Sequence, residues 1–73
     1  MKPANLIKMA NQIGAFFEAM PNREQAVQDI AAHIQRNWDT RMRVALLQHI
    51  GNSGGVELSP MVREAFLLVK KAG

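Results

Sequence analysis

The stretch that decides the fold is Asn37-Trp38-Asp39-Thr40-Arg41-Met42-Arg43, which holds the only tryptophan of the 73-residue chain. Before it, apolar residues recur every three or four positions from Ala26 onward and lead up to Trp38. After it, Met42 begins a second pattern with the same period, and Asp39 stands where an N-cap residue is expected. The sequence therefore predicts two helices, over residues 22–37 and 39–50, that meet at this joint.

A third helix is predicted ahead of this pair, over residues 4–20. It follows from seven apolar residues that share one helical face: Leu6, Met9, Ala10, Ile13, Phe16, Phe17 and Met20. Pro21 ends this helix because the residue before a proline is pushed out of the α region. Asn22 is then expected to cap the next helix, with Gln25 at its N3 position.

A last helix is predicted over residues 59–71, with Ser59 as N-cap and Pro60 as first helical residue. Gly51 is expected to end the helix before it, so that residues 51–55 form a flexible loop. Short connections favour antiparallel packing of consecutive helices. The expected fold class is all-α, a small compact four-helix domain spanning residues 1–73, with the first helix as its spine.

Composition limits the class of protein. A single small core has to suffice without disulfides, because the chain has no cysteine. Residues 1–20 enter directly into an amphipathic pattern, and no apolar run approaches the roughly 18 residues of a membrane span. We therefore expect a cytoplasmic chain that binds no membrane.

Charge and apolar surplus both point to a partner. Of the net charge of +3, two units lie in residues 33–49. Once the four apolar faces are turned inward, several apolar residues remain on other helical faces: Ile7, Val44, Leu47, Leu67 and Leu68. They mark either a protein interface on the last two helices or a more tightly wrapped core.

Signals for catalysis are weak. Residues 51–55 match the G-x-S-x-G nucleophile elbow, but that motif requires a strand before it, and here a helix is predicted. His33 and His49 lie on different predicted helices without metal-ligand spacing. No catalytic, cofactor-binding or metal-binding residue is expected.

Three interpretations of the tryptophan and its neighbouring arginines stay open. In a structural one, Trp38 fills the joint between the two central helices. In a docking one, Arg36, Arg41 and Arg43 pair with carboxylates of a protein partner while Trp38 or Met42 anchors nearby. In a third, the helix predicted over residues 39–50 enters a groove of a nucleic acid, but two arginines without a longer basic face would neutralise little phosphate charge. Docking is favoured for the arginines, and no nucleic acid is expected as a partner.

Three blocks of the sequence are similar to the delta subunit of NAD-dependent formate dehydrogenase. They are Leu6-Ile7-Lys8-Met9-Ala10-Asn11-Gln12-Ile13-Gly14-Ala15-Phe16-Phe17, the pattern Trp38-Asp39-x-Arg41-Met42-Arg43, and Leu58-Ser59-Pro60-Met61-Val62-Arg63-Glu64-Ala65. The chain departs from the family pattern at Thr40, where proline is common, and at Asn37, where an aromatic is common.

The resemblance implies a protein that is not an enzyme by itself. It implies an accessory subunit that stabilises or helps to mature a cytoplasmic molybdenum- or tungsten-dependent formate dehydrogenase. In such a complex the large alpha subunit carries molybdopterin guanine dinucleotide and iron–sulfur clusters, and other subunits carry FMN and bind NAD. None of these cofactors is expected to bind this chain.

We expect the chain to dock on the alpha subunit. From the family motifs, together with Arg36, we infer nine candidate partner-binding residues: Arg36, Trp38, Asp39, Arg41, Met42, Arg43, Pro60, Arg63 and Glu64. An anchor such as Trp38 would cost about 2–4 kcal/mol of binding when truncated to alanine. Alternatives are a transient maturation chaperone that is absent from the mature enzyme, and a small nucleic-acid-binding regulator. The isolated chain could also form a homo-oligomer through its apolar faces.

Overall fold

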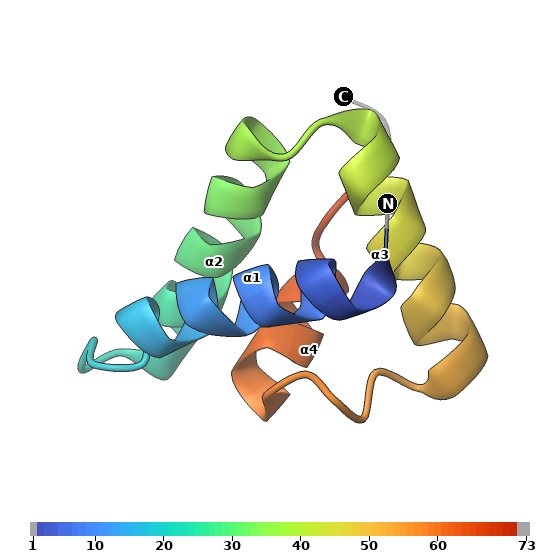
Figure 1. Cartoon of the computed structure of the whole chain (residues 1–73). Coiled ribbons are helices and arrows are strands. Elements are labelled where there is room, and N and C mark those ends of the chain that lie inside the picture. Colours follow the sequence, from blue (N-terminus) through green and yellow to red (C-terminus); the bar gives the residue numbers. More distant parts are fainter. Residues whose placement is uncertain (1, 72–73) are drawn as a thin grey trace.

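Four helices make up the computed structural model, which describes residues 2–71 (Figure 1). They are α1 (Pro3–Phe17), α2 (Arg23–Asn37), α3 (Thr40–Ser53) and α4 (Pro60–Phe66). Within the described range there is no strand. The predicted all-α, four-helix class is confirmed.

The helix starts lie where the capping residues predicted them. The Asn22 side chain accepts a hydrogen bond from the Gln25 amide at 3.1 Å, and the Asp39 side chain accepts one from the Met42 amide at 2.9 Å. Each satisfies one of the amide groups that a helix N-terminus leaves without a partner. At α4, Pro60 is the first helical residue as predicted, but the Ser59 hydroxyl makes no capping bond.

Two predicted helix ends lie too far along the chain. The helix predicted to residue 20 ends at Phe17, and Met20 donates back to the Phe17 carbonyl in a tight turn, as expected just before Pro21. The helix predicted to residue 71 ends at Phe66. There the Lys70 amide donates to the side-chain oxygen of Gln35 at 2.7 Å instead of to its own helix. A tertiary contact thus takes the place of the last helical turns.

The end of α3 was also predicted wrongly. Gly51 is helical, and the helix continues to Ser53, so only the second half of the predicted 51–55 loop lies outside a helix. Gly54 and Gly55 have φ angles of +79° and +70°, the left-handed conformation that glycine adopts without strain. The chain therefore turns at the Gly54-Gly55 pair and not at Gly51.

Helix α1 packs against all three other helices, as expected of a spine. The expectation of antiparallel neighbours is wrong, because α2 and α3 diverge from their short connection and α3 and α4 make few contacts with each other (Figure 1). The most extensive packing is instead between α2 and α4. Because α3 and α4 both lie against α1 but not against each other, space remains between them.

The core lies where α1, α2 and α4 meet, with Leu46 contributed by α3. Its largest fully buried side chains are Leu6, Ile30, Ile34, Leu46 and Val62. Two residues of the predicted apolar face of α1 are instead exposed: Met9 at 41% and Phe16 at 77%. Gly14 is buried in their place and brings α1 close to Val62 of α4.

Candidate protein-docking surface

Trp38 lies inside the domain, at the end of α2. Its side chain is 4% exposed, and its ring packs against Phe66 with ring centroids 5.9 Å apart. This burial agrees with the structural interpretation, in which Trp38 fills the joint between the two central helices, while a role of Trp38 in docking stays a prediction. Truncating the side chain would cost folding stability, about 3–5 kcal/mol for a core aromatic.

Arg43 is likewise buried, at 5% exposure, and it organises the joint between α2 and α3. Its Nη1 donates to the carbonyls of Gln35 and Trp38 at 2.9 and 2.8 Å. Its Nη2 donates to the Thr40 hydroxyl at 3.2 Å and to the Lys71 carbonyl at 3.3 Å. One guanidinium therefore ties α2, α3 and the segment after α4 together.

The position of the Arg43 charge explains why it is tolerated without a carboxylate. The last carbonyls of a helix lack intrahelical partners and carry the negative end of the helix dipole. The guanidinium lies at this end of α2 and donates to the Gln35 carbonyl in the last helical turn and to the carbonyl of the C-cap residue Trp38. Arg43 is therefore engaged within the domain, and its pairing with a partner's carboxylate stays a prediction.

The rest of the 37–43 stretch divides by exposure. Asp39 is exposed but serves as the N-cap of α3, and Met42 is half-buried against the core. Arg36 and Arg41 are exposed. Only these two arginines of the joint present their side chains to solvent.

A groove opens between α3 and α4, where the two helices diverge. It encloses about 500 Å³ and is lined by Leu47, Ile50, Gly54, Pro60, Arg63, Glu64, Phe66 and Leu67. Three of the predicted site residues line it: Pro60, Arg63 and Glu64. Two residues of the predicted apolar surplus, Leu47 and Leu67, face it from opposite walls, and Leu67 is 82% exposed. The groove thus joins the motif residues of α4 to an apolar surface.

The rim of the groove carries both positive and negative side chains, and they differ in whether they are paired. Glu64 forms an ion pair with Arg23 of α2, and both side chains are about half exposed. The hydrogen bond and charge of Arg23 hold the pKa of the Glu64 carboxyl below its ordinary value. Arg63 makes no ion pair within residues 2–71, and Lys71 lines a depression that shares Leu47 with the groove. The rim therefore carries an excess of positive charge.

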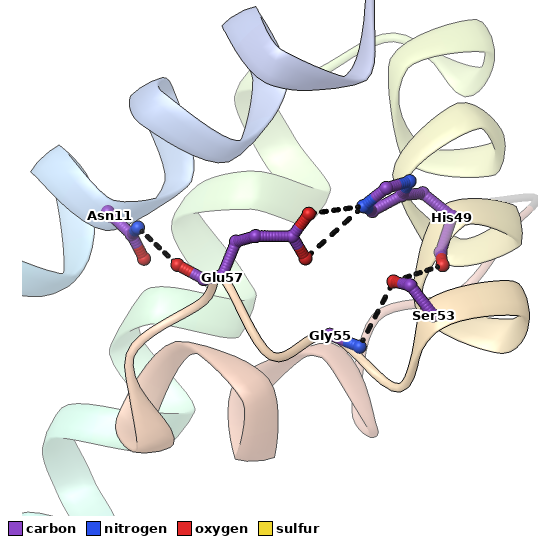
Figure 2. Close-up of polar contacts among 5 residues, drawn as sticks. All are labelled: Asn11, His49, Ser53, Gly55 and Glu57. Atoms are coloured by element: carbon purple, nitrogen blue, oxygen red, sulfur yellow. Dashed lines mark hydrogen bonds and ion pairs between the residues drawn. The ribbon is translucent and has the colours of Figure 1, made fainter.

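A clamp from α1 fixes the loop that leads into α4 (Figure 2). The side-chain amide of Asn11 donates to the Glu57 carbonyl at 3.0 Å, as Figure 2 shows. The side-chain oxygen of Asn11 also accepts from the Ser59 backbone amide at 3.0 Å. Nothing in the sequence singled out Asn11, because its partners lie more than forty residues away. The clamp sets where α4 begins and hence the position of one groove wall.

The serine of the G-x-S-x-G match is engaged in local hydrogen bonds. The Ser53 hydroxyl donates to the His49 carbonyl at 2.9 Å and accepts from the Gly55 amide at 3.4 Å (Figure 2). His49 turns its Nε2 toward the Glu57 carboxylate, at 3.3 and 3.4 Å from the two oxygens, and not toward Ser53. These contacts join the last turn of α3 to the loop that follows it, and Ser53 and His49 are not arranged as a nucleophile and its base.

Other parts of the surface offer smaller features. Gln12, Ile13, Phe16, Phe17 and His33 line a hollow of about 370 Å³ between α1 and α2. Among residues 2–71 no three His, Asp or Glu side chains gather in a way that could hold a metal ion. In the same range no helix has the length and apolar character needed to cross a bilayer.

One comparison with known proteins identifies a family. The family model of the NADH-dependent formate dehydrogenase delta subunit FdsD matches residues 5–66. This range includes all three sequence blocks on which the resemblance rested, and both walls of the groove except Leu67. No curated protein and no solved structure matches the chain.

Proposed function

The chain belongs to the NADH-dependent formate dehydrogenase delta subunit family, and from that premise we propose that it is a non-catalytic accessory subunit. In this proposal it associates with the other subunits of a cytoplasmic molybdenum- or tungsten-dependent formate dehydrogenase. It docks on the large alpha subunit and stabilises the complex or assists its maturation. The cofactors of the reaction are carried by those partner subunits.

The groove between α3 and α4 is the observation that carries the proposal. A small domain that encloses its core leaves single apolar side chains at the surface, but here apolar residues of two helices line one groove. Leu67 is exposed at its edge. Contiguous apolar surface with a polar rim is typical of protein interfaces.

The residues of the proposed interface are revised accordingly. Pro60, Arg63 and Glu64 stay in it because they line the groove. Arg36 and Arg41 stay as exposed candidates outside it. Trp38 and Arg43 are buried and do not line the groove, and Asp39 and Met42 act in the fold, as cap and as core contact.

Co-purification tests the proposal. The tagged chain is expressed together with formate dehydrogenase subunits, and the recovered material is analysed for subunit composition and formate–NAD activity. Stoichiometric recovery with active enzyme supports a permanent subunit. Recovery only with an alpha subunit that lacks its cofactors supports transient action in maturation, and recovery of no formate dehydrogenase subunit overturns the proposal.

Two matched variants locate the interface. Leu67→Glu places a charge at the edge of the groove, whereas Phe16→Glu places one on α1 at a residue of similar exposure, 77% against 82%. Burying the new carboxylate of the Leu67 variant is costly, so that variant should lose the complex. The Phe16 variant should keep it. Circular dichroism of both isolated variants checks that the helices are retained.

A further inference from the structure

We infer that the groove between α3 and α4 receives one amphipathic helix of a formate dehydrogenase subunit, with an apolar stripe flanked by acidic residues. The inference rests on the proposed function, because it specifies the partner segment that the accessory subunit would hold. It adds the secondary structure of that segment, its length and its charge.

The shape of the groove favours a helix. One wall runs from Leu47 of α3 to its C-cap Gly54, and the other runs from Pro60 of α4 to its C-cap Leu67, so each wall is about 10 Å long at 1.5 Å per residue. Two helical walls present side chains and no free backbone edge, whereas an extended peptide would need such an edge for pairing. An apolar helix of about two turns fits, with contacts at positions i, i+3 or i+4, and i+7.

The floor and edges of the groove supply the apolar contacts. Leu47 and Ile50 are half-buried on α3, and Phe66 is buried at the base on the α4 side. Leu67 is almost fully exposed at the edge, where a partner helix would cover it. Gly54 lines the same wall and has open space where a side chain would be, which lets another backbone approach closely.

The rim charges determine the flanks of the partner helix. Arg63 has no ion partner among residues 2–71, while the one carboxylate of the rim, Glu64, is already paired with Arg23. Lys71 adds a further cation beside Leu47. A carboxylate next to the apolar stripe would pair with Arg63, in two parallel hydrogen bonds where the geometry allows. A second copy of this chain fits less well, because it also carries a net charge of +3.

Photo-cross-linking tests the identity of the occupant. Benzoylphenylalanine replaces Leu67 in one variant and Phe16 in a control of similar exposure. Each is bound to the formate dehydrogenase complex prepared without this chain, irradiated and digested. The variant with the probe at position 67 should cross-link to one partner segment that is helical, apolar on one face and bordered by Asp or Glu. The control should not cross-link to that segment.

Charge reversal tests the rim. Arg63→Glu should weaken binding about tenfold, because it removes a rim ion pair and adds repulsion. Lys8→Glu, a charge reversal at an exposed residue of α1 that does not line the groove, should bind as the unchanged chain does. The loss caused by Arg63→Glu should shrink when salt is raised from about 0.1 M to about 1 M, since the screening length falls from about 10 Å to about 3 Å.

The outcomes separate this inference from the proposed function. If the unchanged chain does not bind the complex, both are overturned. If it binds but the probe at position 67 cross-links to a loop, a strand, a basic helix or another copy of this chain, only the inference is overturned. Equal binding by the Arg63→Glu and Lys8→Glu variants would likewise reject the acidic flanks.

Discussion

Gly14→Ala is expected to destabilise the domain although it should improve the helix. Gly14 lies within α1, and a Cβ built on it would lie 2.3 Å from Cγ2 of Val62 on α4. Real Cβ atoms essentially never come this close to another heavy atom, so one of the two helices has to move. Val62 is fully buried and cannot turn away into solvent. The absence of a side chain at Gly14 therefore allows the close spacing between α1 and α4.

Two opposing effects determine the size of the change. Alanine in place of glycine stabilises a helix interior by about 1 kcal/mol. Overpacking a well-packed core costs about 1–3 kcal/mol, and the closeness of this contact places it at the upper end. The net expectation is a loss of about 2 kcal/mol. That is a large share of the roughly 4–11 kcal/mol expected for a domain of 73 residues.

Thermal and urea denaturation followed by circular dichroism measure this loss. For a domain of this size the Tm should fall by roughly 8–16 °C. Val62→Ala is the matched background, because it removes the methyl group that the new Cβ would meet. In that background Gly14→Ala should become neutral or stabilising by up to about 1 kcal/mol. A Tm at or above that of the unchanged protein, or an equal loss in both backgrounds, would refute the steric explanation.

Three further changes test the polar contacts. Arg43→Lys should lower the free energy of unfolding by about 2 kcal/mol and speed the hydrogen exchange of the Lys70 amide, because an ammonium group cannot serve the four oxygens that the guanidinium serves. An unchanged midpoint of urea unfolding would contradict this prediction. Asn11→Asp keeps the acceptor for the Ser59 amide but at neutral pH loses the donor to the Glu57 carbonyl, so it should lower the free energy of unfolding by about 1–3 kcal/mol. In urea titrations this loss of stability should be smaller below about pH 4, because a protonated carboxyl can donate again. Arg23→Ala should raise the pKa of Glu64, measured by NMR titration, because Arg23 lowers that pKa in the folded protein. The ion pair stabilises the fold above the unfolded pKa of about 4.3, and this stabilisation is lost as pH falls through the folded pKa. An unchanged pKa of Glu64 in the variant would exclude the pairing.

The helices themselves were predictable because they depend on local chemistry. Period, capping and proline placement involve residues within four or five positions of one another, and the starts of α2 and α3 were correctly assigned from Asn22 and Asp39. The end of α4 was not, because the Lys70 amide pairs with Gln35, thirty-five residues away. Local rules carry no information about such a partner.

The candidate surface was predictable only in part, for the same reason. Leu47 and Leu67 could be recognised as apolar residues left over from the helical faces, and both line the groove. That they face each other depends on how α1 separates α3 from α4. Conversely, the helical pattern does not distinguish buried Arg43 from exposed Arg41, because the burial of Arg43 depends on how α3 folds back against the end of α2 and on the segment after α4.

The Asn11 clamp has a consequence for how the protein is made. The two clamp bonds join residues 46 and 48 positions apart, so the ribosome releases α1 well before the segment that α1 holds. At about 5–20 residues per second, translation of the intervening chain takes several seconds. During that interval the face of α1 that α4 covers in the folded domain lacks its packing partner and stays exposed. The groove, whose second wall is α4, forms only after this delay, so the proposed docking requires that α4 has already been synthesised.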